Sequence, residues 1–231
     1  MSRKIAIIQP CYIPWKGYFD IIANVDEFVI FDDVDFVRRT WYNRNRIKRE
    51  DGSRWLTIPV SYSQTAPTLI KDTPIHGGWV DEHLDIIRTY YHKAPYFGHV
   101  FPGLEAAYES VRETNRLGEV TTHLIQYLCS TLGLTTPLIR ASTLGAKGKK
   151  TDRLLEICKK RKAKTYLSGP AAQAYFETEK FKSANITVEW MDYSGYPEYK
   201  QLGLPFEHHV SILDLLFMTG ENAHNYMKHV K

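Results

Sequence analysis

The stretch IAIIQPCYIPWKGYF, residues 5–19, decides the fold of this chain. Its first four residues are continuously apolar, which is typical of a strand buried on both faces of a parallel sheet. Gln9 and Pro10 end this strand. A helix is expected to begin near Pro14, because the nitrogen of a proline in a first helical turn would lack an intrahelical partner anyway. Open α/β sheets usually bind ligands where a first strand meets a first helix in this way.

The turn between this strand and helix carries side chains typical of a site. Gln9, Tyr12 and Lys16 crowd together at the carboxyl end of the strand. The aromatic residues Tyr12, Trp15 and Tyr18 would also suit a hydrophobic core, but a purely apolar core would not need the polar residues among them. We therefore expect a binding or catalytic role for this turn.

The bulk composition indicates one globular domain. The chain has 231 residues, of which 43% are hydrophobic and 24% charged, and no linker rich in Pro, Gly or Ser divides it. These values exclude disordered and fibrous classes. No apolar run approaches the roughly 20 residues that span a bilayer, and the N-terminus passes from two basic residues directly into a strand. A single domain over residues 1–231, located in the cytoplasm, is expected.

The cysteines and the net charge limit the kinds of site and ligand that this chain can have. Three cysteines cannot form a paired framework, and none has the spacing of a metal site. Cys129 and Cys158 lie in apolar helical patterns, so we expect them to be small core residues. Cys11 lies in the opening turn and could be a nucleophile, but no histidine flanks it in sequence, so this role is disfavoured. The net charge of +4 permits an anionic small molecule, but nucleic-acid binders usually have a stronger basic stripe.

A second apolar strand at residues 28–31 is followed by two acidic residues. Asp32 and Asp33 come directly after this strand, where a carboxylate can bind a ribose hydroxyl, a metal or an amine. A solvated turn explains the same pattern, and both interpretations stay open.

Basic and aromatic residues alternate over residues 36–60, which we interpret as a β-hairpin with its turn at Asp51 and Gly52. Arginine matches a phosphate bidentately, and asparagine supplies neutral donors. A solvated face rarely includes Trp and Tyr, so an anion site is favoured, for a nucleotide or for a single-stranded nucleic acid. The candidate ligands of this anion are Asn43, Arg44 and Lys48.

Residues 79–136 form a helical segment on the evidence of their hydrophobic spacing. Its histidines, His83, His92, His99 and His123, lack the i, i+4 pairing with a glutamate base found in zinc proteases. No metal site is therefore predicted.

The sheet resumes after the helical segment. Strands are expected at residues 137–140, 164–167 and 186–191, with helices between them, the first of which is expected to be capped by Thr151 or Asp152. The loop before that helix is small and basic, and a helix N-terminus is a ready anion site, although the order of a P-loop is absent. The candidate binding residues of these units are Ser142, Lys149, Arg153, Ser168, Gly169 and Tyr175, the last in a helix with Ala171 and Ala172.

A final helix begins after Ser211, the expected N-cap, and Asp214 at its third position suggests a capping box. His208 and His209 come just before it and could bring an imidazole to the site, although adjacent histidines are often merely exposed.

Alternation of strands and helices predicts an α/β fold with a mostly parallel, twisted sheet covered by helices on both faces, as in Rossmann-like proteins. Gln9, Asp32, Ser142 and Ser168 each follow the carboxyl end of a predicted strand. Because these ends meet at one edge of the sheet, we expect the four side chains to converge.

The ordered motifs of the chain resemble those of the WbqC-like family, and the match runs through nearly the whole sequence. They are QPCYIPWKGYF at 9–19, the acidic pair at 32–33, NRNRIK at 43–48, LTIPV at 56–60, KAPYF at 93–97, YLSG at 166–169 and SILDLLF at 211–217. Members occur with polysaccharide and O-antigen (lipopolysaccharide) biosynthesis genes. The resemblance implies transfer of glycine or another amino-acyl group onto a sugar amine.

The first strand, turn and helix are also similar, more loosely, to the ATP-binding start of pantothenate-synthetase-like ligases of the HUP class. The turn of those enzymes carries the signature H-x-G-H, whereas this chain has Trp15, Lys16, Gly17 and Tyr18 at the matching place. Both histidines are missing, so this resemblance implies the fold more than the adenylation chemistry.

Acylation of a sugar amine needs a proton acceptor, donors to the oxyanion and a pocket for the nucleotide carrier. The expected enzyme forms an amide on a nucleotide-linked amino sugar and uses an activated acyl donor or ATP, with no other cofactor indicated. An ATP-dependent acid-amine ligase and a non-catalytic nucleotide-sugar-binding subunit are the alternatives, and a homo-oligomer is compatible with each.

The sequence offers candidate residues for each part of this reaction. The candidate proton acceptors are Asp32, Asp33, His208 and His209. The candidate oxyanion donors are Gln9, Tyr12, Tyr18 and Ser168. The candidate diphosphate ligands are Arg44, Lys48 and Arg153, and the candidate substrate contacts are Trp15 and Lys16.

Overall fold

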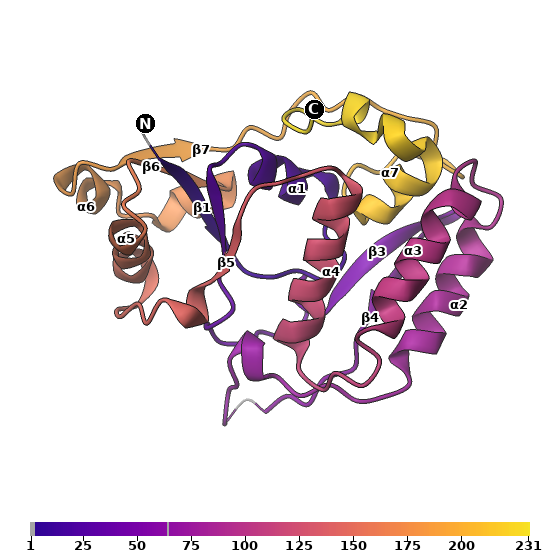
Figure 1. Ribbon diagram of the computed structural model, residues 1–231, viewed down its shortest axis with the longest axis horizontal. Helices are drawn as coiled ribbons and strands as arrows, with labels where there is room; N and C mark the ends of the chain where they lie inside the picture. Colours follow the sequence, from indigo (N-terminus) through magenta and orange to yellow (C-terminus); the bar gives the residue numbers. More distant parts are fainter. Residues whose placement is uncertain (1–2, 64) are drawn as a thin grey trace.

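The computed structural model describes residues 3–63 and 65–231 and contains a five-stranded parallel sheet (Figure 1). The strand order is β5-β2-β1-β6-β7, and all neighbouring strands are parallel. The fold class is therefore as predicted, an α/β fold of Rossmann-like architecture. The strands are β1 (Lys4–Ile8), β2 (Glu27–Ile30), β5 (Leu138–Arg140), β6 (Thr165–Ser168) and β7 (Thr187–Trp190).

The path of the chain through the sheet reverses once. It starts at the central strand β1, moves to one edge through β2 and β5, and then returns to the other side of β1 to add β6 and β7. The crevice between the carboxyl ends of β1 and β6 is the switch point at which open α/β sheets bind ligands.

Alternate residues of the strands pack on opposite faces of the sheet, as the strand period of two requires. Ile5, Ile7 and Val29 pack on one side against Ile157 of α5 (Lys150–Lys160) and Phe181 of α6 (Thr178–Ser183). Ala6, Phe28 and Leu167 belong to the larger core on the other side, which includes α1 (Lys16–Ala23). Both faces are covered, which explains why the strands are continuously apolar in sequence.

The second part of the larger core is built from a hairpin and four helices, drawn on the right of Figure 1. The hairpin strands β3 (Arg44–Arg49) and β4 (Gly52–Thr57) are antiparallel, with the turn where the sequence predicts it. The helices are α2 (Trp79–Tyr91), α3 (Phe97–Glu109), α4 (Leu117–Thr131) and α7 (Ile212–Thr219), and the short 3-10 helices of the chain are η1 (Ile70–Asp72), η2 (Ala141–Thr143), η3 (Pro170–Tyr175) and η4 (Gly220–Tyr226). No helix in the described part of the chain is both long and apolar enough to cross a membrane.

One local prediction was wrong. The helix that contains Arg153 begins at Lys150 after the N-cap residue Lys149, so Thr151 and Asp152 lie inside its first turn instead of capping it. Ala171, Ala172 and Tyr175 lie in a helix, as predicted. This helix is the short 3-10 helix η3, which buries none of its residues.

The capping box expected at α7 is also wrong in its second member. Ser211 caps the helix, because its hydroxyl accepts from the Leu213 backbone N–H at 3.3 Å. The buried Asp214 carboxylate instead accepts hydrogen bonds from the Tyr91 hydroxyl at 3.0 Å, the Tyr199 hydroxyl at 2.7 Å and Gln201 Nε2 at 2.8 Å. A carboxylate buried this deeply is tolerated because several donors surround it.

The C-terminal segment is held by another buried carboxylate. Asp20 of α1 accepts hydrogen bonds from the backbone N–H groups of residues 228, 229 and 230 at 2.8–3.2 Å. The Lys228 ammonium donates in turn to the carboxylate and backbone oxygens of Asp192 and to the Ser194 carbonyl. The last residues of the chain therefore fasten the loop after β7 to the first helix.

Candidate functional site

A cavity of ≈ 940 Å³, which we call the main cavity, opens at the carboxyl ends of β1 and β6. Gln9 follows β1, Ser168 ends β6 and Phe31 follows β2, and all three line it. Its volume is within the range of small-molecule sites, and it lies at the switch point of the sheet. The crevice predicted from the strand order is therefore open in this protein.

Aromatic side chains form much of the wall of the main cavity. Trp15 contacts two other rings of this wall. The centroid of its ring lies 4.9 Å from that of Tyr193 and 4.9 Å from that of His209. Trp41, from the turn before the hairpin, and Tyr175, from η3, complete the wall, and 43% and 75% of these two residues is exposed. Aromatic surfaces of this kind stack on planar groups such as nucleobases or sugar rings.

The polar lining of the cavity is sparse. Gln9 and Ser168 line it from the strand ends, Asn45 from the hairpin and His209 from the segment before α7. Lys150 and Thr151 line it at the first turn of α5. The N-terminus of that helix and the Lys150 ammonium together favour an anionic group at this end of the cavity.

The turn over residues 9–15 holds a strained backbone. Ile13 has φ = 36°, which a β-branched residue rarely adopts. Asn45 Nδ2 donates to the Tyr12 and Ile13 carbonyls at 3.1 and 2.9 Å, and the Ile212 N–H donates to the Pro14 carbonyl at 2.8 Å. Contacts from two distant elements therefore fix the turn that carries Trp15.

Gly17 permits the close approach of Trp15 to the start of α1. A Cβ atom at Gly17 would lie 2.3 Å from the Trp15 indole, so any larger residue would displace the ring from the cavity wall. The glycine in the stretch PWKGY thus has a packing role at the site.

Two further residues of the opening stretch line the cavity. The buried Tyr18 hydroxyl donates to the Gln9 carbonyl at 3.1 Å, and burial raises the pKa of Tyr18 well above its ordinary value. Burial likewise raises the pKa of the Cys11 thiol to about 12. Cys11 is therefore protonated near neutral pH, which argues against a nucleophilic role.

Asp32 and Ser142 lie together at the same edge of the sheet but do not line the main cavity. The buried Asp32 carboxylate accepts from Arg140 Nε at 2.7 Å, from the Ser142 hydroxyl at 2.9 Å and from the Ser142 N–H at 3.0 Å. The four polar strand ends thus converge as two pairs, Asp32 with Ser142 and Gln9 with Ser168.

Asp33 and Arg153 form an ion pair beside the Phe31 ring. Burial raises the pKa of Asp33, and the neighbouring Arg153 guanidinium opposes this shift. Neither residue lines the main cavity, although Leu154, the next residue along α5, does.

Tyr12 and Lys16 face away from the cavity. The buried Tyr12 hydroxyl contacts Tyr108 and lies 2.7 Å from His83 Nδ1, and burial lowers the pKa of His83 to about 4. The Lys16 ammonium lies over the rings of Tyr196 and Tyr199 and donates to the Pro197 carbonyl at 3.3 Å. Within this strained turn, Cys11 and Trp15 line the cavity, whereas Tyr12 points into the core. The sequence alone could not show these directions.

Lys48 and His208 are also separated from the main cavity. The fully buried Lys48 ammonium donates to the Pro205 carbonyl at 2.7 Å and to Glu207 at 3.3 Å, so it stabilises the hairpin. His208 packs on Phe206, and burial lowers its pKa. Of the four candidate proton acceptors, His209 is the one that lines the cavity.

The family comparison agrees with the motifs found along the chain. The model of the WbqC-like protein family matches residues 9–226. The chain belongs to the WbqC-like family. A relative from Mycobacterium tuberculosis (strain ATCC 25618 / H37Rv), "Uncharacterized protein Rv1507c", is 40% identical over 230 residues, which cover 99% of each chain. No solved structure matches the chain significantly.

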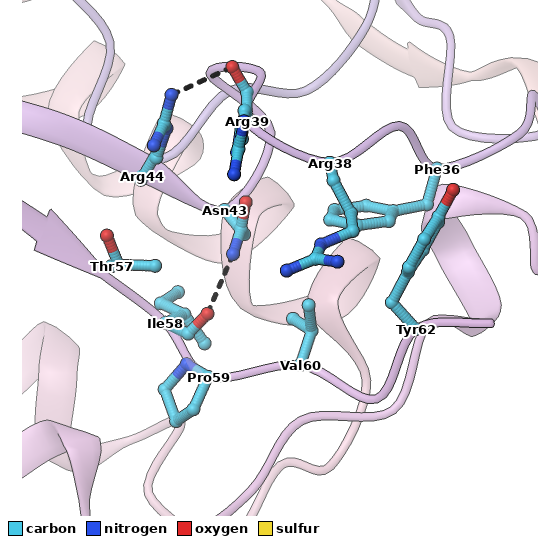
Figure 2. Close-up of a pocket in the computed structure, with 10 residues that line it drawn as sticks. All are labelled: Phe36, Arg38, Arg39, Asn43, Arg44, Thr57, Ile58, Pro59, Val60 and Tyr62. Atoms are coloured by element: carbon cyan, nitrogen blue, oxygen red, sulfur yellow. Dashed lines mark hydrogen bonds between the residues drawn. The ribbon is translucent and has the colours of Figure 1, made fainter. Parts of the chain in front are cut away.

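This WbqC-like protein has a second, smaller pocket of ≈ 460 Å³ at the base of the hairpin (Figure 2). We call it the arginine pocket, because Arg38, Arg39 and Arg44 line it together with Asn43. Asn43 Nδ2 donates to the Ile58 carbonyl at 2.8 Å, and Arg44 donates to the Arg39 carbonyl at 2.9 Å. Asn43 and Arg44, predicted as anion ligands, therefore lie here and not in the main cavity.

Several residues of the main cavity were not singled out from the sequence of this WbqC-like protein. Trp41 belongs to the aromatic and basic stretch of residues 36–60, and its place in a turn between two strands was the available signal. Lys149, which was expected at the site, is the N-cap of α5, and its neighbour Lys150 lines the cavity instead. Tyr193 carries no local signal, because a tertiary contact with Trp15 places it.

The described residues of the WbqC-like fold hold no group of three or more His, Cys, Asp or Glu side chains arranged to bind a metal ion. The groups that line the main cavity are two side-chain amides, hydroxyls, a thiol, an imidazole, an ammonium group and the Glu177 carboxylate, around aromatic walls.

Proposed function

We propose that this protein is an enzyme of surface-polysaccharide (O-antigen) biosynthesis that forms an amide on a nucleotide-linked amino sugar, by transfer of a glycyl-type or other acyl group. The observation that carries this proposal is the main cavity, an aromatic-walled crevice of ≈ 940 Å³ at the switch point of the sheet. Such a crevice suits a nucleotide carrier, whose base stacks and whose phosphates need cationic or helix N-terminal partners. Family membership is compatible with this role.

The proposed placement of the ligand follows the chemistry of the walls. The base or sugar ring lies between Trp41 and Tyr175, the two most exposed aromatic residues of the lining. The diphosphate lies toward Lys150 and the N-terminus of α5. The amino group of the sugar then lies near Gln9 and Ser168 at the strand ends.

The proposed reaction needs one proton acceptor and stabilisation of one oxyanion. The neutral sugar amine attacks the carbonyl carbon of the activated acyl group, the leaving group departs, and the His209 imidazole accepts the proton of the amine. The Gln9 amide and the Ser168 hydroxyl are the proposed donors to the oxyanion. His209 is exposed, so it can exchange this proton with water.

A screen of nucleotide sugars by thermal shift tests the binding step. At least one nucleotide-linked amino sugar should raise the melting temperature of the wild-type protein. Tyr175→Ala should lose most of this shift, whereas Gln173→Ala, an exposed residue of the same 3-10 helix that does not line the cavity, should retain it. No shift with any nucleotide sugar would overturn the proposal.

An ATP-dependent acid-amine ligase is the second candidate, favoured by the sheet order and by the basic first turn of α5. It differs in its requirement for ATP, which would activate the acid before the amine attacks. Release of pyrophosphate when ATP, an amino acid and the amino sugar are incubated with the enzyme would favour the ligase. Amide formation from a preactivated donor without ATP would favour the transferase.

A further inference from the structure

The arginine pocket carries positive charge that no carboxylate in the described part of the chain neutralises. Arg38, Arg39 and Arg44 form no ion pair among residues 3–63 and 65–231. Two other arginines of the same hairpin do, since Arg46 pairs with Glu207 and Arg49 with Asp51. Three guanidinium groups without a carboxylate partner among the described residues thus surround one pocket.

The turn at Arg39 and the side chains of Arg44 and Arg38 have specific contacts. Arg39 has φ = 60°, in the left-handed region that non-glycine residues rarely occupy. Arg44 donates to its carbonyl and stacks over Trp55 at 4.2 Å, while Arg44 Nε is buried and has no hydrogen-bond partner among the described residues. Arg38 lies over the Tyr62 ring at 5.4 Å, and Figure 2 shows its guanidinium directed into the pocket. A strained backbone held by its surroundings is characteristic of functional sites.

We infer that the arginine pocket is a second binding site, which takes the phosphate group of a phosphorylated small molecule through Arg38 and Arg39, with Arg44 as a positioning residue. Three guanidinium groups match the two or more charges of a phosphomonoester or diphosphate better than the single charge of a carboxylate. Phe36, Val60 and Tyr62 supply an apolar wall for the organic part of the ligand. The volume of ≈ 460 Å³ is sufficient for a sugar phosphate or a nucleotide.

The position of the pocket relates it to the main cavity. Residues 38, 39 and 43 line the arginine pocket, while Trp41, in the same turn, lines the main cavity. An occupied arginine pocket would therefore order the turn that carries one aromatic wall of the main cavity. The phosphate is either part of the ligand in the main cavity or belongs to a separate donor, and both sources share the same chemistry.

Isothermal titration calorimetry with inorganic pyrophosphate, at fixed ionic strength, tests this site by measuring the affinity for a diphosphate. The wild-type protein should bind pyrophosphate, and Arg38→Gln and Arg39→Gln should each weaken binding about tenfold or more, because each removes a charge-assisted contact. The matched control is Arg54→Gln, since Arg54 is also an exposed hairpin arginine without a carboxylate partner, but it does not line the pocket. This control should bind as the wild-type protein does.

The arginine side chains report the site directly. Addition of pyrophosphate should shift the Nε–Hε NMR signals of Arg38 and Arg39 and leave that of Arg54 unchanged. Absence of binding, equal affinity for acetate, or undiminished binding by both glutamine variants would overturn the inference. Because pyrophosphate has no base or sugar, this result does not depend on the function proposed for the main cavity.

Competition identifies the source of the phosphate once binding is established. If pyrophosphate lowers the affinity of the wild-type protein for a nucleotide sugar but no longer does so in Arg38→Gln, the diphosphate of that ligand occupies the arginine pocket and not the position proposed near Lys150. If both bind together, the pocket belongs to a second, separate phosphorylated molecule.

Discussion

The two sides of the sheet's carboxyl edge differ in what their polar residues contact. At β2 and β5, the Asp32 carboxylate is saturated by Arg140 and Ser142, so the edge is closed. At β1 and β6, Gln9 and Ser168 are uncharged and line an open cavity. A carboxylate opposite an arginine on the neighbouring strand closes the crevice with an ion pair, whereas neutral side chains leave it available for a ligand. Position at a strand end therefore predicts where a polar residue lies, but its neighbours decide whether it is structural or functional.

The largest expected effect comes from breaking the closed side. Asp32→Ala leaves Arg140 without its buried partner and should lower the free energy of unfolding by about 3 kcal/mol. Ser168→Ala, on the open side, should lower it by about 1 kcal/mol, because the Ser168 hydroxyl accepts one long hydrogen bond, from the Tyr166 hydroxyl at 3.4 Å. Urea denaturation of both variants makes the comparison, and equal losses would contradict it.

A second prediction tests whether the open side binds a planar group. Trp41→Ala should weaken binding of a nucleotide sugar about tenfold, since stacking on an aromatic ring is worth about 1–3 kcal/mol. Trp55→Phe is the control, because Trp55 is about as exposed as Trp41 but does not line the main cavity. The ring centroids of the two tryptophans are 5.2 Å apart. Titration followed by fluorescence measures both. Equal losses in the two variants would place the ligand elsewhere.

A third prediction separates the two directions in which the opening stretch points. Burial lowers the pKa of Lys16 to about 8, so the folded protein binds this proton less tightly than the unfolded chain. The contribution of Lys16 to the free energy of unfolding should therefore rise between about pH 8 and the ordinary lysine pKa of about 10.4. Lys16→Met lacks this contribution. Between about pH 8 and 10.4, the free energy of unfolding of the wild-type protein should therefore increase by about 1 kcal/mol relative to that of the variant, a value already reduced for solvent screening.

Urea denaturation at both ends of this pH window measures the gain. A difference that does not change with pH would mean that Lys16 is solvated. The affinity for a nucleotide sugar should be the same in Lys16→Met and the wild-type protein, since the side chain faces the tyrosine rings and not the cavity.

The smallest effect is expected at Cys11, which lines the open side but is protonated near neutral pH. Cys11→Ala should change the affinity for the ligand, and any turnover, by less than about twofold, because the hydrogen bond of its Sγ to the Gln9 carbonyl at 3.7 Å is weak. Loss of turnover with binding retained would instead identify Cys11 as a nucleophile.

The strands were predictable because both faces of the sheet are covered, so residues 5–8 and 28–31 could be apolar without interruption. The sequence also located Gln9 and Ser168, since strand ends share one edge. It could not locate Asp214, which has the position of a capping residue but binds tyrosines 123 and 15 residues away. It could not orient Tyr12 either, because the strained backbone at Ile13 turns that side chain into the core.

The fastening of residues 228–230 to Asp20 has a consequence for local opening of the cavity wall. Lys228 holds the loop that carries Tyr193, and Tyr193 completes the cavity wall against Trp15. Detachment of residues 228–230 from Asp20 would therefore free this loop without unfolding the sheet. Amide hydrogen exchange at residues 228–230 and in the loop after β7 should accordingly rise and fall together.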